Sequence, residues 1–367
     1  MRLWRSIKAV GYQRIVIART PSTRLASTLI QSRAAKDLIQ YLLTRLRNLA
    51  MLACVPTLIG FLGRFGWFLD LFAHFRWQYA FILTVGILAS LMRERPPQSL
   101  AAGPERNWHR WTQGTLLIVW LVNAYALASA NGPVPVEAPP SSAGLKLLVV
   151  NIHLGNEDPS ALLALIEHEA PDVVGVVELS PAMSAKLTSL DDRYPNAHRE
   201  PRDDAFGIGV WWRAADGSVQ QIASQPLGFP SLRLTLTLDG SPLHIWLTHP
   251  VPPMSAQMHG WRAQQLRDLA ARIAAEPGDH VLAGDLNATP WSIAYRQLRT
   301  TTGMLDAGAG SLPRWTWHGG GTLGWLFAIP IDHALVTPGL VVSEYRIGPD
   351  VGSDHRPVIV RVGRAVR

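Results

Sequence analysis

The chain has a single cysteine, Cys54, among its 367 residues. One cysteine allows neither a disulfide within the chain nor a metal site built from several cysteines. Acidic residues are scarce in the first part of the chain: residues 1–144 hold 16 Lys and Arg against 5 Asp and Glu, and residues 145–367 hold 18 against 22. The net charge of +7 is therefore the sum of +11 in residues 1–144 and −4 in residues 145–367. The C-terminal part lacks the basic excess that favours tight binding to duplex DNA.

Charge is absent altogether from three apolar runs, which cover residues 48–63, 77–92 and 111–130. A helix needs roughly 20 apolar residues to cross a bilayer. The third run meets this length, and the first two meet it with their flanking residues. We therefore predict a membrane region over residues 48–130, with transmembrane helices at about 48–69, 77–92 and 111–130. The alternative is three buried helices of a soluble domain.

Basic residues around these runs indicate their orientation. Residues 1–47 hold ten Lys and Arg against one acid, the loop 93–110 holds four arginines, and the loop 64–76 holds two. Basic segments remain on the cytoplasmic side. Residues 1–47 are thus expected to form a basic cytoplasmic arm on anionic lipid. A multi-pass protein of the cytoplasmic (inner) membrane follows, with its C-terminal part facing the periplasm or exterior. Residues 131–144, "NGPVPVEAPPSSAG", predict an extended Pro-rich linker.

From Leu145 onward, the pattern changes to alternating strands and helices. The stretches "LKLLVVNI", "VVGVVEL" and "HVLAGDLN" predict strands, and "MHGWRAQQLRDLAARIAA" predicts an amphipathic helix. The alternating stretch "LRLTLTL" followed by the turn "DGSP" predicts an antiparallel hairpin. Mixed sheets covered by outer helices are the expected architecture.

Polar side chains recur where these apolar strands end. A single acid at such a place usually forms a turn, but five strand ends with polar groups indicate a site held on a rigid scaffold. The residues concerned are Asn151, Glu178, His249, Asp285, Asn287, Asp332, His333, Asp354 and His355.

These motifs resemble those of the endonuclease/exonuclease/phosphatase superfamily, which includes deoxyribonuclease I-like nucleases, abasic-site endonucleases, sphingomyelinases and inositol-polyphosphate phosphatases. The resemblance covers residues 145–363 and is carried, in order, by "VVNI", "VVELS", "LTHP", "GDLNATP", "IDHALV" and "GSDHRPV". It implies a four-layer α/β sandwich of two mixed β-sheets over residues 145–367. It also implies hydrolysis of a phosphoester with Mg²⁺, or with Mn²⁺ as an alternative cofactor.

Glu178 is the expected metal ligand, because it is a lone acid that closes an apolar strand and Mg²⁺ prefers oxygen ligands. The superfamily usually has Gln before this acid, where this chain has Val177. Asn151 is expected to offer its carbonyl oxygen to the water shell of the metal. Asp354 is expected to lie near the metal or the phosphate.

The resemblance also implies catalytic roles. His355 is the candidate base or transition-state donor, and Asp332 would fix its tautomer. His249 would protonate the leaving group or bind the phosphoryl group. Asp285 would orient or deprotonate the attacking water, and Asn287 would donate to a phosphoryl oxygen. The alternative for the last two residues is an Asx turn.

Other residues carry weaker expectations. Arg233 is a candidate substrate ligand, although a solvated strand arginine is the commoner case. His333 alternates to the other face of its strand and is expected to be structural. Trp315, Trp317 and Trp325 could meet a lipid surface or stack on a base.

Two functions from these observations stay open. The first is a membrane-anchored phosphoesterase acting on a phosphodiester or phosphomonoester, with a lipid-linked ester favoured because tethering raises its effective concentration. The second is an extracytoplasmic nuclease acting on DNA. A non-catalytic module is disfavoured, because every motif residue is present.

Overall fold

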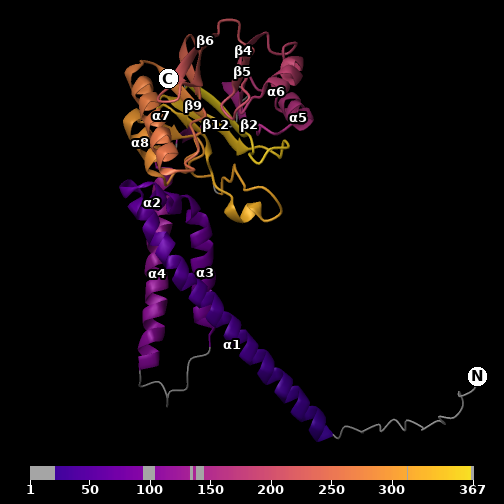
Figure 1. Ribbon diagram of the computed structural model, residues 1–367, viewed down its shortest axis with the longest axis vertical. Helices are drawn as coiled ribbons and strands as arrows, with labels where there is room; N and C mark the ends of the chain where they lie inside the picture. Colours follow the sequence, from indigo (N-terminus) through magenta and orange to yellow (C-terminus); the bar gives the residue numbers. More distant parts are fainter. Residues whose placement is uncertain (1–20, 94–103, 133–134, 138–143, 312, 365–367) are drawn as a thin grey trace, which may run out of the picture.

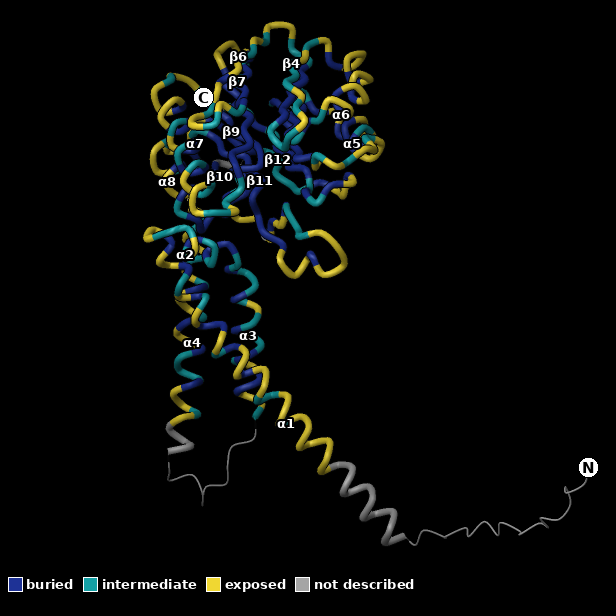
Figure 2. The backbone as a smooth tube through the Cα atoms, viewed as in Figure 1, coloured by how far each residue is buried: buried dark blue, intermediate teal, exposed yellow. Residues whose placement is uncertain are grey.

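The computed structural model describes residues 21–93, 104–132, 135–137, 144–311 and 313–364. The first part is helical and consists of α1 (Pro21–Ile59), η1 (Gly60–Phe65), α2 (Trp67–Leu71), η2 (Phe72–Phe75), α3 (Arg76–Met92) and α4 (Pro104–Asn131). Three stretches are long and apolar enough to cross a membrane: Arg33–Phe65, Trp67–Met92 and Trp108–Ala130. Figure 2 shows many exposed residues along these helices, as expected for helices that face lipid.

The helices differ in extent from the sequence prediction. α1 begins at Pro21, so its helix continues through much of the segment predicted as a basic arm; the rest of that arm, residues 1–20, lies outside the described residues. Where the sequence predicted a loop over residues 64–76, the chain forms the short helices α2 and η2, which begin the second candidate span. Part of the loop predicted over 93–110 also lies outside the described residues.

The second part of the chain is a layered α/β domain. Its helices are α5 (Ser160–Glu169), α6 (Pro181–Lys186), η4 (Leu187–Leu190), α7 (Ala256–Ala275), α8 (Ile293–Thr302) and η5 (Gly324–Phe327). Its strands are β1 (Val136–Glu137), β2 (Leu145–Asn151), β3 (Val173–Val177), β4 (Asn196–Glu200), β5 (Ile208–Trp212), β6 (Ser218–Ser224), β7 (Phe229–Leu238), β8 (Ser241–Leu247), β9 (Asp279–Asp285), β10 (Leu305–Asp306), β11 (Asp332–Val336), β12 (Leu340–Ile347) and β13 (Val358–Arg364).

The strands form two mixed sheets. The first has the order β1-β12-β13-β2-β3-β5-β4, and the second has the order β10-β11-β9-β8-β7-β6. In the first sheet, β2 and β3 are parallel neighbours, and in the second, β8 and β9 are parallel neighbours. The carboxyl ends of each parallel pair therefore point to one edge of their sheet, where the polar residues of the sequence motifs follow.

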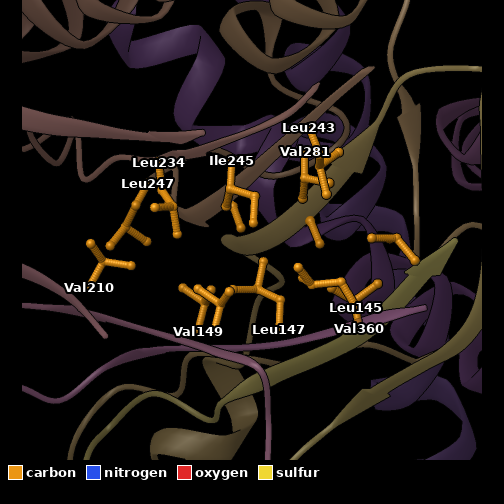
Figure 3. Packing of buried hydrophobic residues seen from close by; sticks show 14 of the residues in the cluster. Leu145, Leu147, Val149, Val210, Leu234, Leu243, Ile245, Leu247, Val281 and Val360 are labelled. Carbon is orange, nitrogen blue, oxygen red and sulfur yellow. The ribbon is translucent and has the colours of Figure 1, made fainter. Parts of the chain in front are cut away.

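The main hydrophobic core lies between the two sheets. Leu147 and Val149 of the first sheet pack against Leu234, Ile245 and Leu247 of the second (Figure 3). A second cluster packs α5 and α6 on the outer face of the first sheet, and a third packs α7 and α8 on the outer face of the second. Helices thus cover both outer faces (Figure 1). This arrangement confirms the predicted four-layer α/β sandwich.

The segment predicted as an extended Pro-rich linker contains a short strand, β1. Val136 and Glu137 pair in parallel with Val341 and Val342 of β12. The backbone there is extended, as the Pro-rich composition predicts, but it is also held at the edge of a sheet. Residues 133–134 and 138–143 lie outside the described residues.

Candidate active site

Six polar side chains come together at one edge of the two sheets. Three belong to the first sheet and three to the second: Asn151 ends β2, Glu178 follows β3, His355 precedes β13, His249 follows β8, Asp285 ends β9 and Asp332 begins β11. All are buried except Glu178, which is partly exposed. Every one of them was predicted from the sequence as a site residue.

Asp285 lies at the centre of this cluster and is 1% exposed. Its Oδ2 accepts from Asn151 Nδ2 at 3.1 Å, and it lies 3.4 Å from His249 Nε2 and 3.7 Å from His355 Nε2. Its Oδ1 accepts from the backbone N–H of Asn287 at 2.8 Å. Asp285 can therefore form the Asx turn and also belong to the site, because Oδ1 makes the turn and Oδ2 faces the other polar side chains.

Gly284 explains why the motif begins with glycine. Its φ is +141°, in a region that other residues rarely adopt. A Cβ at this position would lie 2.1 Å from the carbonyl oxygen of Thr248. β9 can therefore approach the end of β8 only because residue 284 has no side chain, and this contact brings Asp285 beside His249.

His355 and Asp332 form a hydrogen-bonded pair, with His355 Nδ1 at 2.8 Å from Asp332 Oδ2. Because a carboxylate accepts, Nδ1 carries the proton and Nε2 faces Asp285. Burial lowers the pKa of His355, but the charges of Asp332 and Asp285 outweigh burial and raise it to about 10. The two carboxylates therefore favour the protonated form of His355, which can donate from Nε2.

Asp285 has the opposite shift. Burial raises its pKa, but the charge of His355 and the hydrogen bond from His249 outweigh burial and lower it to about 2. Burial also lowers the pKa of His249, and its hydrogen bond to Asp285 outweighs this and raises it. The site thus places an ionised carboxylate between two imidazoles that hold protons readily.

Glu178 and Asn151 are fixed as a pair. Glu178 has a left-handed φ of +60°, a strained conformation that directs its carboxylate back over the end of β2. Its Oε1 accepts from Asn151 Nδ2 at 2.8 Å, and its Oε2 accepts from the N–H of Leu154 at 2.8 Å.

The structure corrects the expected role of Asn151. Its Oδ1 accepts from the N–H of His153 at 2.9 Å, so its amide nitrogen, not its carbonyl oxygen, faces the cluster. That nitrogen donates to both Glu178 and Asp285. In this orientation, Asn151 holds the two carboxylates in place through its nitrogen, and its carbonyl oxygen faces the loop that follows β2.

The carboxylates at the site fit a hard divalent cation. Glu178 and Asp285 both flank the amide of Asn151, and carboxylate oxygens are the ligands that Mg²⁺ prefers. Ligand atoms of Asp285, Asp332 and His355 also lie within 4.8 Å of one another and could hold a metal. We favour Glu178 as the ligand, because Asp285 already faces Asn151 and two imidazoles, His355 Nδ1 is bonded to Asp332, and imidazole is a poor ligand for Mg²⁺.

The other predicted residues lie around this cluster. Asn287 lies in the left-handed region at φ +48° and donates from its amide to the carbonyl of Pro250 at 2.9 Å. Asp354 accepts from Trp317 Nε1 at 2.9 Å, and its Oδ1 is buried without a partner among the described residues. His333 points away from the site, as expected, and contacts the carbonyl of Ala288 through Nε2 at 2.8 Å.

Arg233 does not reach the site, and the prediction that it binds substrate is wrong. It lies opposite Trp246 in the pairing of β7 with β8. Its neighbours Leu232 and Leu234 face the core between the sheets, so Arg233 faces the helix-covered side. There its guanidinium forms an ion pair with Glu276 at the end of α7.

Two residues that hold the site were missed by the sequence analysis. Ser353 donates to the carbonyl of Asn151 at 2.8 Å and accepts from the N–H of His355 at 3.0 Å, which ties the "SDH" loop to β2. Arg262 is fully buried in α7 and donates to the carbonyl of Asn287. The signal for Arg262 was its place on the apolar stripe of α7 with Leu266 and Leu269.

Comparisons with known proteins agree with this geometry. The model of the Endonuclease/Exonuclease/phosphatase family matches residues 148–355. No curated protein matches the chain significantly. The chain resembles several solved structures. D. rerio TDP2 complexed with single strand DNA product has a TM-score of 0.52 and 18% identity, covering 60% of this chain and 100% of that chain. An endonuclease/exonuclease/phosphatase from Bacteroides vulgatus has a TM-score of 0.49 and 19% identity, covering 61% of this chain and 100% of that chain. Sphingomyelinase C from Streptomyces griseocarneus has a TM-score of 0.46 and 17% identity, covering 60% of this chain and 99% of that chain.

Fold and site together define a metal-dependent phosphoester hydrolase. Because the family model spans residues 148–355, more than half of the chain, the chain belongs to the Endonuclease/Exonuclease/phosphatase family. Both conclusions confirm the sequence prediction.

Proposed function

We propose that the protein is a membrane-anchored, Mg²⁺-dependent phosphoesterase whose substrate is a lipid-linked phosphoester. The three apolar helices would cross the cytoplasmic membrane and leave the catalytic domain on the outer side, as their basic flanks favour. One observation carries the choice of substrate: the loops that border the active site lie against the membrane helices.

Three contacts hold these loops against the helical part. Trp67 Nε1 donates to the carbonyl of Pro253, four residues after His249, at 2.7 Å. Gln78 Nε2 donates to the carbonyl of Ala328, four residues before Asp332, at 2.8 Å. The active-site edge of the sheets is therefore held toward the end of the membrane helices.

The third contact is a buried ion pair. Arg262 Nη2 lies 3.1 Å from Asp70 Oδ2, and the same guanidinium donates to the carbonyl of Asn287. Asp70 Oδ1 also accepts from the N–H of Ile293 at 3.2 Å, at the start of α8. The short helix α2, at the start of the second candidate span, is thus bonded through Arg262 to the "GDLN" turn and directly to the start of α8.

The same side of the domain exposes apolar side chains. Among the described residues of the catalytic domain, the large exposed apolar side chains lie in two segments, at Met254 and between Trp315 and Phe327. Leu323 is 70% exposed and Leu326 62%. The segment that contains Leu323 and Leu326 projects from the domain on the side of the N-terminal helices (Figure 1). A surface of this kind fits the interface of a bilayer.

The side chains of the site suit hydrolysis of a phosphoester. Asp285, whose lowered pKa keeps it ionised, orients the attacking water and accepts its proton as the water oxygen bonds to phosphorus and the bond to the leaving oxygen breaks. The imidazolium of His355 donates to a phosphoryl oxygen as its charge grows. His249 gives a proton to the leaving oxygen. A bound divalent cation would add neutralisation of phosphoryl charge and would acidify the attacking water.

Replacing Glu178 with Gln is expected to raise the metal requirement. The amide has nearly the same shape but lacks the charge that offsets Mg²⁺, so half-maximal activity should need at least tenfold more Mg²⁺. Turnover against Mg²⁺ concentration measures this directly. The exposed Glu167→Gln on α5 is the matched control and should keep the wild-type requirement. An unchanged requirement in the Glu178 variant would place the metal elsewhere.

A lipid-linked substrate predicts that the apolar rim affects only embedded esters. The full-length protein is reconstituted in liposomes and given the same headgroup phosphodiester either in the bilayer or on a short-chain soluble analogue. The double variant Leu323→Ser/Leu326→Ser should lower turnover of the embedded ester about tenfold or more, since two buried leucines contribute roughly 1.5–3 kcal/mol each at the interface. Turnover of the soluble ester should stay within twofold.

DNA tests the alternative in the same preparation. If the wild-type protein cleaves plasmid or single-stranded DNA efficiently and neither lipid ester, the extracytoplasmic nuclease replaces this proposal. Equal losses on the embedded and the soluble ester would show that the rim leucines support the fold instead of contacting lipid.

A further inference from the structure

A cavity lies away from the active site, where the candidate spans meet the α/β domain. Its volume is about 610 Å³. It is bordered near the end of the first span by Gly60 and Phe61, and at the start of α3 by Arg76. Near the end of α4 it is bordered by Tyr125, Ala126, Ser129 and Ala130. The catalytic domain closes the other side with Pro290, Trp291 and residues of α8. None of the catalytic residues lines it.

Three arginines face this cavity: Arg76, Arg296 and Arg299. Arg76 is 1% exposed and donates only to neutral groups, the carbonyl of Thr57 at 2.8 Å and Oδ1 of Asn123 at 3.3 Å, while its Nε is buried without a partner. Arg299 donates to two backbone carbonyls, and Arg296 is exposed.

The three cavity arginines differ from Arg262, which also lies between the helical part and the α/β domain, in having no carboxylate partner among the described residues. Arg262 is paired with the carboxylate of Asp70. Within the described part of the chain, no carboxylate forms an ion pair with any of the three cavity arginines. A buried guanidinium without a counter-charge is costly. The cavity therefore has the charge of an anion site, and guanidinium groups suit phosphate oxygens in particular.

The remaining lining indicates what kind of anion fits. Phe61 and Tyr125 border the cavity on the side of the spans and are both exposed. An adjoining cavity of about 560 Å³ shares Phe61 and Arg296 and adds Arg64. The site is thus cationic toward the catalytic domain and apolar toward the membrane. Free phosphate would use only the cationic part, whereas a phospholipid would use both.

We propose that this cavity binds the headgroup of an anionic phospholipid, at a site separate from the active site. The ends of the three spans place it at the level where lipid phosphates lie. The inference rests on the membrane anchoring in the proposed function, but not on the identity of the substrate. Trp291 lies four residues after Asn287, so a bound headgroup would also brace the segment that follows the "GDLN" turn.

The test uses the full-length protein in a neutral detergent and follows its thermal unfolding. Phosphatidylglycerol should raise the unfolding midpoint in a saturable way, because a ligand that binds only the folded state stabilises it. Phosphatidylcholine with the same acyl chains, and inorganic phosphate, should have little effect. Arg296→Gln should raise the half-saturating concentration of phosphatidylglycerol roughly tenfold, the loss expected for one charge-assisted hydrogen bond.

Two further variants keep the result interpretable. Arg296→Lys retains the charge and should bind the lipid more tightly than Arg296→Gln. Arg267→Gln, on an exposed position of α7, is the matched control and should behave as wild type. An equal effect of phosphatidylcholine, an equal effect of inorganic phosphate, or equal behaviour of Arg296→Gln and Arg267→Gln would each overturn the proposal. Carbonate extraction of membranes reports separately whether the helices are embedded.

Discussion

Asp285→Asn is expected to lower turnover about 10³-fold, within the range that positioned acid–base groups contribute. The carboxylate contacts Asn151, His249 and His355 at once. An amide has nearly the same shape, but it cannot accept from all three partners, and it removes the negative charge that raises the pKa of both imidazoles. The water would lose its acceptor, and both histidines would hold their protons less readily. Steady-state turnover at saturating Mg²⁺ measures the effect.

The same strand supplies the control. Asp279 begins β9 and Asp285 ends it, so their Cα atoms are about 20 Å apart at roughly 3.3 Å per residue. Asp279 is bonded to Arg364 and Thr337, outside the site. Asp279→Asn should keep turnover within twofold of wild type. If the two variants lose activity equally, or if Asp285→Asn unfolds in the far-ultraviolet circular dichroism spectrum, the catalytic role of Asp285 is not supported.

The sequence predicted the site well where a local rule was sufficient. The carboxyl ends of parallel neighbours in one sheet lie side by side, so Asn151 could be placed near Glu178, and His249 near Asp285, without coordinates. The rule does not predict which way a side-chain amide is oriented. The carbonyl of Asn151 faces His153 and not the site, which the sequence did not indicate. That orientation depends on a backbone N–H two residues further along the chain.

Arg233 shows a second limit. Alternation along β7 puts it on the face opposite Leu232 and Leu234, but the choice between the core and the helix-covered face depends on tertiary packing. Arg262 shows the reverse case. A cation on the apolar stripe of a helix usually extends its charge to solvent. Here it stays buried, because Asp70 approaches from a segment 192 residues away. Contacts between the N-terminal apolar helices and the loops of the α/β domain cannot be inferred from either part of the chain alone.

His355 and Asp332 are expected to act as one unit. His355→Gln and Asp332→Asn should each lower turnover by about 10²–10⁴-fold, and the double variant should be little slower than the slower single variant. The reason is the 2.8 Å bond between them: without the carboxylate the imidazole loses its orientation and charge, and without the imidazole the carboxylate has no catalytic partner. His355→Gln combined with Asp279→Asn is the control pair, and its effects should multiply.

The pH profile separates a donor from a base at this position. Because the carboxylates raise the pKa of His355 to about 10, the donor role predicts activity that falls on the alkaline side as the imidazolium loses its proton. A bound dication lowers that pKa, so the alkaline limb is expected at or below pH 10. In Asp332→Asn one of the charges that raises the pKa is gone, and the limb should move to lower pH. A general base would instead give activity that rises with pH through the pKa of His355. A rising limb that Asp332→Asn shifts to lower pH, or a double variant whose losses multiply, would contradict the paired donor.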